Sequence, residues 1–396
     1  MLGIITEYNP FHNGHKLHIE KSKEKTNSKY CIVVMSGNFS QRGEPTIFDK
    51  YLRTKMALLN GADIVLELPL IFATASAELF SLGAIDILDK TGIVTDICFG
   101  SEEGSLEKFL EVSNILSNET LEFKQHLYKF LDNGLSFPRA RLNALEKTLN
   151  KPLGFLNEPN NILSIEYLKA INKLNSTIIA KTIKREKVHF NSNNINGNIA
   201  SATAIRQAFF KNNIDSIKNV IPNNCFKLIQ NISQNNIPII DNYTSILKYL
   251  LKVSNIENIK QIADVTEGIE NKILDNTNVD SITELINNVK SKRYTYTKLQ
   301  RTILHILLNI TKDDQQYLKE NLNPYIRVLG FKKSSSHLLK ELTINAKVPV
   351  ITNLKNAKKQ IDKNAMYYLN KEVMSTDIYY LSKNKNEEYR QPLVII

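Results

Sequence analysis

The stretch Gly3-Ile-Ile-Thr-Glu-Tyr-Asn-Pro-Phe-His-Asn-Gly-His15 decides the fold. It opens with a short apolar run that predicts a β-strand, and it ends in a His-Asn-Gly-His turn directly before a helix-like segment. In an open α/β sheet, ligands bind at the carboxyl ends of the strands, and the N-terminus of the following helix favours anions. The stretch therefore predicts a strand–turn–helix unit whose turn faces an anionic ligand.

Apolar runs and helix-like segments alternate outward from that unit. Strands separated by helices imply right-handed crossovers, so we predict an α/β, Rossmann-like parallel-sheet domain over residues 1–215. Beyond it we predict a mainly helical region over 216–396, basic from about residue 285. The expected strands are 3–7, 31–35, 63–68, 94–99 and 176–183, and the expected helices are 16–25, 49–59, 73–88, 119–131, 138–149, 162–171 and one that opens at 201–206.

Positive charge is concentrated near the C-terminus. Residues 285–396 hold 20 Lys+Arg against 9 Asp+Glu, and this excess of +11 equals the formal net charge of the whole chain. Such asymmetry predicts a polyanion partner. The densest stretch interleaves cations with tyrosines, which suits a surface that binds phosphates and stacks on unpaired bases. The alternative is a solvated helix start whose tyrosines pack into the core. The candidate RNA contacts are Lys290, Lys292, Arg293, Tyr294, Lys298 and Arg301.

Composition excludes several classes of protein. A hydrophobic share of 42% and a charged share of 23% belong to a globular chain rather than to a disordered, collagen-like or coiled-coil one. Cys31, Cys98 and Cys225 are widely spaced, so we expect buried free thiols, a reducing compartment and no structural metal. No apolar run reaches the roughly 18 residues that cross a bilayer, and Glu7 interrupts any signal-peptide core. We therefore expect a cytoplasmic protein.

Two histidines that flank a glycine at the end of a strand can point at one polyphosphate. Gly14 lets the backbone approach the ligand, while His12 and His15 can donate hydrogen bonds to oxygens that gain charge when pyrophosphate leaves. They are the candidate catalytic residues. The arrangement resembles the His-x-Gly-His signature of nucleotidyltransferases. A zinc-binding pair and histidines that merely cap a helix remain as alternatives.

A second motif for phosphate lies far along the chain, at Ser201-Ala-Thr-Ala-Ile-Arg206. It resembles the Ser-Ser/Ala-Thr-x-Ile-Arg helix start of the same superfamily. Ser201, Thr203 and Arg206 could clamp the β- and γ-phosphates of ATP with the free N–H groups of the helix start. An ordinary capped surface helix is the alternative. The chain has no Walker A loop, no GxGxxG after a strand, and no pyrophosphate loop of the kind that acetyl-CoA-dependent acetyltransferases use.

Nearly the whole chain resembles the bacterial tRNA(Met) cytidine acetate ligases, in segments 3–15, 35–45, 99–102, 160–169, 183–185, 201–206 and 292–295. The resemblance implies a nucleotidyltransferase domain and a two-step reaction. ATP and acetate give acetyl-adenylate and pyrophosphate, and the acetyl group then passes to N4 of the wobble cytidine of elongator tRNA(Met). The products are N4-acetylcytidine and AMP. ATP would bring Mg²⁺, and nothing in the sequence points to an obligate protein partner or a membrane.

The resemblance also implies the ATP site. Gly100 would pass close to the adenosine, Asn161 would hydrogen-bond a polar edge, and Arg185 would face a phosphate or stack on the base. Ser164 departs from the glycine of the family pattern. Besides the phosphate helix, the implied ATP contacts are Ile5, Thr6, Glu7, Tyr8, Asn9, Pro10, Phe11, His12, Asn13, Gly14, His15, Lys16, Leu17, His18, Gly100, Asn161, Arg185 and Glu186.

The loop after the second expected strand, residues 36–45, also reaches the ligand edge of the sheet. Its small residues and amides could form an acetate pocket, and Arg42 could pair with a carboxylate or phosphate. Lys50, Arg53 and Lys55 on the next helix could instead be solvated, and no catalytic base is assigned. The candidate pocket residues are Ser36, Gly37, Asn38 and Arg42.

Two rival functions use the same motifs. One is an adenylyltransferase that makes a dinucleotide or a coenzyme precursor, which gives no reason for the basic, tyrosine-rich tail. The other is an RNA-binding protein with a degenerate nucleotide site, against which the intact pair His12 and His15 argues.

Overall fold

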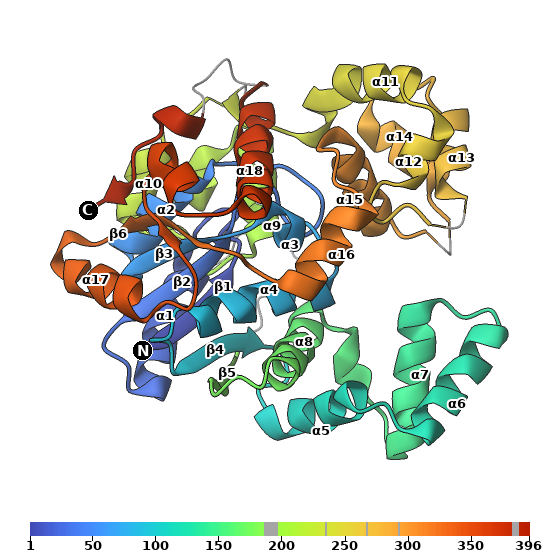
Figure 1. Cartoon of the computed structure of the whole chain (residues 1–396), viewed down its shortest axis with the longest axis horizontal. Helices are drawn as coiled ribbons and strands as arrows, with labels where there is room; N and C mark the ends of the chain where they lie inside the picture. Colours follow the sequence, from blue (N-terminus) through green and yellow to red (C-terminus); the bar gives the residue numbers. More distant parts are fainter. Residues whose placement is uncertain (186–196, 234–235, 267, 292–293, 382–387) are drawn as a thin grey trace.

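The computed structural model describes residues 1–185, 197–233, 236–266, 268–291, 294–381 and 388–396 (Figure 1). Its centre is one sheet with the strand order β5-β4-β1-β2-β3-β6-β7, and β8 pairs with β6 beside this path. The five strands expected from the first half of the chain are present and mutually parallel. The strands are β1 (Leu2–Thr6), β2 (Cys31–Ser36), β3 (Ile64–Leu68), β4 (Asp96–Ser101), β5 (Ile179–Lys184), β6 (Ile326–Phe331), β7 (Val350–Ile351) and β8 (Val394–Ile395).

The last three strands correct the predicted division of the chain at residue 215. β6 lies antiparallel to β3, with Ile64 opposite Phe331 and Glu67 opposite Arg327. The C-terminal region is therefore not a separate helical unit, because part of it completes the sheet of the N-terminal domain. The physical reason is the edge of β3, a fully buried strand that would otherwise leave its backbone groups unpaired.

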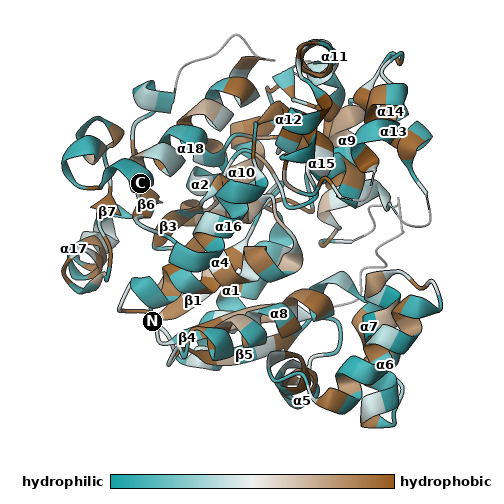
Figure 2. Ribbon diagram, turned by 45° about the vertical axis from the view of Figure 1, so that its right-hand side comes forward, coloured by the Kyte–Doolittle hydropathy of each residue, from teal (hydrophilic) through white to brown (hydrophobic). Residues whose placement is uncertain are grey.

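Helices cover both faces of the sheet, and alternate residues of each strand enter different cores. Ile32 and Val34 of β2 pack in one core with helices that follow β3 and β4, whereas Val33 and Met35 pack in the other with α1, α2 and α10. The helices of this part are α1 (Asn13–Thr26), α2 (Lys50–Leu59), α3 (Leu70–Ala73), α4 (Ala77–Lys90), α5 (Leu106–Ser117), α6 (Leu121–Asp132), α7 (Phe137–Leu149), η1 (Gly154–Asn157), α8 (Pro159–Lys173), α9 (Ala202–Phe210), η2 (Ile214–Ile217) and α10 (Asn223–Ile229). Around these helices, hydrophobic and hydrophilic residues alternate, as one buried and one exposed side require (Figure 2).

A second, helical body follows, with a core of its own. Tyr243, Ile269 and Ile286 are among its buried residues. Figure 1 shows this body, in yellow and orange, beside the sheet domain, and the α6–α7 hairpin projects below it. The remaining helices are η4 (Ile240–Tyr243), α11 (Thr244–Val253), α12 (Ile256–Lys260), α13 (Ile269–Asp275), α14 (Ile282–Val289), α15 (Tyr296–Leu307), α16 (Lys312–Asn321), η5 (Lys333–Ser335), α17 (Ser336–Asn345), η6 (Leu354–Lys359), α18 (Lys363–Leu381) and η7 (Glu388–Arg390).

In the part of the chain that the structure describes, no helix combines the length and apolarity needed to cross a bilayer.

Candidate active site

The His-Asn-Gly-His turn forms the N-terminus of α1 and fixes both histidine rings through the backbone. Nδ1 of His12 accepts a hydrogen bond from the Gly14 N–H at 3.1 Å, and Nδ1 of His15 accepts one from the His12 N–H at 3.3 Å. A neutral imidazole that accepts at Nδ1 carries its proton on Nε2. Both rings are therefore held as donors whose Nε2–H is not used by the turn, so capping and ligand binding are compatible roles for the same two side chains.

These imidazoles are neutral at physiological pH. Burial, followed by the charge of Arg185, lowers the pKa of His12 to about 3. Burial and the neighbouring His12, Arg185 and His18 lower the pKa of His15 well below its usual value. Burial and Arg185 likewise lower the pKa of His18 to about 4. The rings of His12 and His15 stack with centroids 3.7 Å apart, an approach that two imidazolium ions would oppose.

Arg185 reaches this histidine face from the end of β5. Its backbone N–H donates to the Ser101 carbonyl at 2.8 Å. A Cβ at Gly100 would lie 3.2 Å from Cγ of Arg185, so glycine leaves room for that side chain at the end of β4. Arg185 is exposed and Gly100 is half-buried. Gly100 and Arg185 thus lie side by side at the ligand edge, while Glu186 lies outside the described residues.

Asn161 lies buried beneath the same edge, where the protein itself uses its amide. Its Oδ1 accepts from the backbone N–H groups of Glu102 at 2.9 Å and Glu103 at 3.2 Å. Its Nδ2 donates to the Phe155 carbonyl at 2.7 Å. Asn161 therefore holds the turn after β4 in place. Ser164, the departure from the family pattern, is buried in α8 and donates to the Asn160 carbonyl at 2.8 Å.

Helix α9, which is predicted to bind phosphate, lies against the histidine turn, although almost 190 residues separate them. Oγ of Ser201 accepts from the Ala204 N–H at 3.1 Å and caps the helix. Arg206 donates to the Asn9 carbonyl at 3.0 Å and to Oγ1 of Thr203 at 3.3 Å. Nδ2 of Asn13 reaches the carbonyls of Asn198 and Asn219 at 2.8 Å each. The two motifs form one site, in which Arg206 also braces the turn.

The other members of the N-terminal stretch divide into buried and exposed side chains. Tyr8 and Phe11 are buried, and their rings pack edge to face at 4.7 Å. Asn9 is buried and precedes Pro10 through a cis peptide bond. Lys16 is exposed and lies 3.9 Å from Glu20. Ile5, Thr6, Glu7 and Leu17 are half-buried.

The loop over residues 36–45 is a small hairpin tied to the same stretch. Phe39 pairs with Pro45, and the Gly43 N–H donates to the Ser40 carbonyl at 2.9 Å. Oε1 of Glu7 accepts from the Gln41 N–H at 2.7 Å, and Oδ1 of Asn9 accepts from the Ile47 N–H at 2.9 Å. Glu44 also pairs with Arg206 at 3.4 Å. The hairpin is therefore tied to the histidine stretch at Gln41 near its tip and at Ile47 just after its end, and to α9 through Glu44.

The chain is similar to known proteins over nearly its whole length. The model of the HIGH Nucleotidyl Transferase family matches residues 1–392. The tRNA(Met) cytidine acetate ligase of Clostridium perfringens (strain SM101 / Type A) is 45% identical over 367 residues, covering 90% of each chain, and that of Halothermothrix orenii is 41% identical over 399 residues, covering 96% of this chain and 94% of its own. This chain belongs to the tRNA(Met) cytidine acetate ligase family. It is an enzyme of that ligase family.

A solved member of the family has the same fold. The crystal structure of Thermotoga maritima TmcAL bound with alpha-thio ATP superposes with a TM-score of 0.93 at 31% identity, over 100% of this chain and 99% of that chain. The apo form of the same protein superposes with a TM-score of 0.95. The α/β nucleotidyltransferase fold expected from the sequence is thereby confirmed. Among the described strands, β6 runs antiparallel to β3, and β7 and β8 run parallel to β6, so these three strands run opposite to the five N-terminal ones.

A buried arginine, Arg53, organises the ligand edge of this ligase, although its helix position also allowed a solvated side chain. Arg53 of α2 donates to the carbonyls of Phe48 at 2.9 Å, Ser36 at 3.1 Å and Glu7 at 2.5 Å, and also to that of Gly37. Burial lowers its pKa to about 10, so it stays charged at neutral pH. It draws together the chain after β1 and the chain after β2, which are the two segments that form the site. Lys55 is exposed, as expected.

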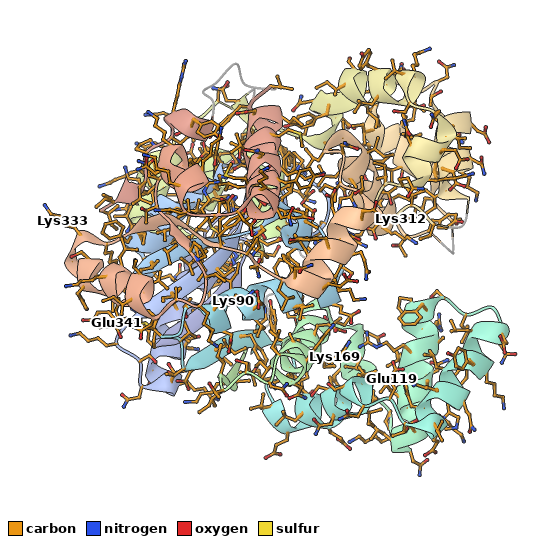
Figure 3. The ribbon with its side chains drawn as sticks, viewed as in Figure 1. Lys90, Glu119, Lys169, Lys312, Lys333 and Glu341 are labelled. Carbon is orange, nitrogen blue, oxygen red and sulfur yellow. The ribbon has the colours of Figure 1, made fainter. Side chains whose placement is uncertain are left out.

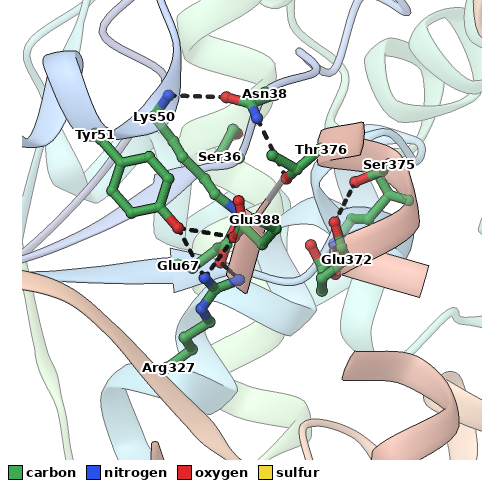
Figure 4. A network of polar contacts seen from close by, with 12 residues as sticks. Ser36, Asn38, Lys50, Tyr51, Glu67, Arg327, Glu372, Ser375, Thr376 and Glu388 are labelled. Carbon is green, nitrogen blue, oxygen red and sulfur yellow. Dashed lines mark hydrogen bonds and ion pairs between the residues drawn. The ribbon is translucent and has the colours of Figure 1, made fainter. Parts of the chain in front are cut away.

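Beneath the hairpin lies a network of four buried charges from distant segments (Figure 4). Nζ of Lys50 lies 2.6 Å from Glu67 and 2.7 Å from Glu388. Arg327 lies 2.7 Å from Glu67 and pairs with Glu388 as well. Burial raises the pKa of Glu388, but Lys50 and Arg327 outweigh it and bring the value to about 2. Two cations and two anions thus neutralise one another under the site.

This network lies against the residues of the predicted acetate pocket, and the side chain of Asn38 is engaged in hydrogen bonds beside it. Oδ1 of Asn38 accepts from the Lys50 N–H at 2.8 Å, and Nδ2 donates to Oγ1 of Thr376 at 3.3 Å. A Cβ at Gly37 would lie 2.8 Å from Oε1 of Glu67, so the backbone passes directly over that carboxylate. Asn38 therefore positions the hairpin. Ser36 is buried, and Arg42 at the hairpin tip is exposed.

The sequence held one signal for this network. Glu67 is a lone acid within the otherwise apolar strand β3, and Lys50 and Arg53 lie among buried apolar residues of α2. Charges in such positions are expected to be buried with partners. The partners Arg327 and Glu388 lie about 260 and 320 residues after Glu67 in the sequence, so no local pattern predicts them.

The predicted RNA segment is largely engaged within the protein. Tyr294 is 4% exposed and belongs to the helical core, so its prediction as an RNA contact is wrong, and the core alternative applies. Nζ of Lys298 donates to Oγ1 of Thr266 at 2.8 Å, and Nε of Arg301 donates to Asp264 at 3.0 Å. Lys290 is exposed, whereas Lys292 and Arg293 lie outside the described residues.

A cavity of about 580 Å³ opens elsewhere, between α4, α8 and the α6–α7 hairpin. Glu119 and Lys169 mark its two sides in Figure 3. Two of its cations are paired, because Glu166 accepts from Arg141 and from Lys169, each at 2.8 Å. None of the described residues that line it belongs to the predicted ATP site.

Proposed function

We propose that this chain forms acetyl-adenylate from ATP and acetate and transfers the acetyl group to N4 of the wobble cytidine of elongator tRNA(Met). Family membership supports the ligase chemistry. One observation in the site supports adenylation most directly: two neutral histidines whose Nε2–H donors are fixed by the backbone at the N-terminus of α1, beside the capped helix α9.

In the first step, an acetate oxygen forms a bond to the α-phosphorus of ATP while the bond to the β-phosphate bridging oxygen breaks. Pyrophosphate leaves with its electron pair. The Nε2–H groups of His12 and His15 stabilise the oxygens that gain charge. Neutral donors suit this role because they need no proton from solution at physiological pH. The N-terminal N–H groups of α9 bind the departing phosphates, and Ser201 and Thr203 lie at the same helix start.

In the second step, N4 of the cytidine attacks the acetyl carbonyl, AMP leaves with the phosphate oxygen, and N4 loses one proton. A free carboxylate is a poor acyl donor, and its attachment to AMP as a mixed anhydride activates it. The hairpin 36–45 is the wall on which the acetyl group would rest, because it is bound to Glu7 and Asn9 of the histidine stretch.

Mg²⁺ fits this site as a companion of ATP. Among the residues that the structure describes, no group of three or more His, Cys, Asp or Glu side chains is placed to hold a metal ion. Mg²⁺ would therefore be held chiefly by the phosphate oxygens and would neutralise the leaving pyrophosphate.

The test is acetate-dependent exchange of labelled pyrophosphate into ATP, followed by addition of tRNA and nucleoside analysis for N4-acetylcytidine. Exchange followed by acetylated cytidine is the expected result. Exchange without acetylation would leave carboxylate activation and refute the acceptor. Absence of exchange both with and without tRNA would refute the activation step and favour an adenylyltransferase with another acceptor.

A further inference from the structure

The positive charge of the C-terminal region gathers at a site other than the predicted one. Lys355, Lys358 and Lys359 of η6 and Lys363 at the start of α18 are all exposed. We call these four residues the lysine cluster. Among described residues, none of the four forms an ion pair with a carboxylate. The acid within this segment, Asp362, accepts from the Ala365 N–H at 2.8 Å and caps α18.

The lysine cluster stands on a fixed base. Ala357 of η6 and Ala365 of α18 are buried against Tyr325 and Ile351 in a small core. Ile351 belongs to β7, which is hydrogen-bonded to β6. A polyanion that binds the four ammonium groups would therefore not have to order the backbone that carries them, which lowers the entropic cost of binding.

Two independent measures place the lysine cluster near the active site. η6 follows β7 and packs on Tyr325, which directly precedes β6. At this N-terminal end of β6, Arg327 lies opposite Glu67 near the carboxyl end of β3. η6 therefore lies at the carboxyl edge of the parallel strands. Four strand spacings separate β7 from β1, or about 19 Å. Along α18, Lys363 lies about 20 Å from Thr376, which contacts the hairpin through Asn38.

An exposed aromatic ring lies beside the last of these lysines. Tyr367 is 49% exposed and lies one helical turn after Lys363, so the two side chains are neighbours on the surface of α18. Cations next to an exposed ring are the combination that binds phosphates and stacks on an unpaired base. Tyr294 offers no such surface, because its ring is buried.

We propose that the lysine cluster binds the phosphate backbone of the RNA substrate, on the stem that adjoins the nucleotide held in the active site. This inference rests on the proposed function for the identity of the RNA. A stem that begins at the hairpin and runs along the carboxyl edge toward β7 reaches the lysine cluster after about 20 Å. The contacts are sequence-independent, so they set affinity and orientation while other residues read the base.

The experiment compares two variants of the full-length protein with equal changes of charge. The first is K355A/K358A/K359A/K363A. The control is K25A/K29A/K333A/K340A, four exposed lysines near the opposite edge of the sheet, where α1 ends and β6 leads into α17. Lys333 is labelled there in Figure 3. Binding of a tRNA(Met) transcript is measured between 50 and 200 mM KCl, together with acetate-dependent pyrophosphate exchange and the KM for tRNA.

We expect the lysine-cluster variant to bind RNA about 10- to 100-fold more weakly at low salt, with a salt slope reduced by about 3 to 4. Its exchange activity should equal that of the wild type, which also reports a folded active site. The control should bind within about threefold of the wild type. Equal losses in the two variants, or an unchanged salt slope in the first, would overturn the inference. A wild type that binds RNA without acetylating it would instead refute the proposed function and leave the surface assignment to be judged by the binding data.

Discussion

The histidine turn and the buried charge network lie on two sides of the same hairpin, yet they are built in opposite ways. In the turn, the partners are at most three residues apart, and the backbone itself orients His12 and His15. In the network, the partners come from α2, β3, β6 and η7. The orientation of the two histidine donors is determined by local sequence, whereas the charge network that supports the hairpin forms only in the completed fold.

Breaking the network should have the largest effect. Lys50→Met leaves Glu67 and Glu388 with one cation for two buried anions, so we expect a loss of about 3 to 5 kcal/mol in the free energy of unfolding. Urea denaturation measures it. The double variant Lys50→Met/Glu67→Gln removes one charge of each sign and should recover part of the loss. A single variant as stable as the wild type would contradict the account of the network.

Removing a donor from the turn should affect catalysis more than stability. His15→Ala deletes one Nε2–H, and we expect pyrophosphate exchange to fall by about 10²- to 10³-fold, with tRNA affinity nearly unchanged. His12→Ala should lose comparable activity, and each variant should lose about 1 kcal/mol of stability, because both histidines take part in capping α1. Equal loss of exchange and tRNA affinity in His15→Ala would refute the separation of roles.

His12, which is buried, and His18, which is half-buried, predict a pH dependence of stability. Their pKa values are lower in the folded protein than in the unfolded chain, so the unfolded chain binds the extra protons as the pH falls. The stabilisation is complete above about pH 6.5 and is lost toward about pH 4 for His18 and about pH 3 for His12. Each group contributes a slope of up to about 1.4 kcal/mol per pH unit in that window. Thermal unfolding of His18→Gln should show a shallower slope than the wild type below pH 6, and an identical slope would contradict burial of that ring.

The predicted RNA segment should give the smallest effect. Lys292→Ala/Arg293→Ala removes two cations, and we expect a salt-dependent loss of tRNA affinity of about tenfold or less at low salt, with pyrophosphate exchange unchanged. Filter binding at several salt concentrations measures it. A fall in exchange would mean that this segment takes part in the nucleotide site. A loss larger than that of the lysine-cluster variant would return the main RNA surface to residues 290–301.

Much of the site could be predicted because its motifs are continuous in sequence. Apolar periodicity predicts the strand before His12, and capping residues predict the turn and the start of α9. The structural functions of Asn161 and Arg206 could not be predicted from the sequence, because their side chains hydrogen-bond to backbone atoms that are distant in sequence. Tyr294 shows the limit of composition, since an interleaved basic stretch looks the same whether its rings face solvent or a core.

By itself, the sequence determined the α/β class, the five parallel strands, the pairing of the histidine turn with α9, and the family. Those features follow from local periodicity and short motifs. Only the tertiary structure decided that β6 closes the edge of β3, that Lys50 and Arg53 are buried, and that the exposed cations gather at η6 and the start of α18. The reason is physical: a charge is buried or free according to what lies across from it, and in this chain that neighbour is often hundreds of residues away.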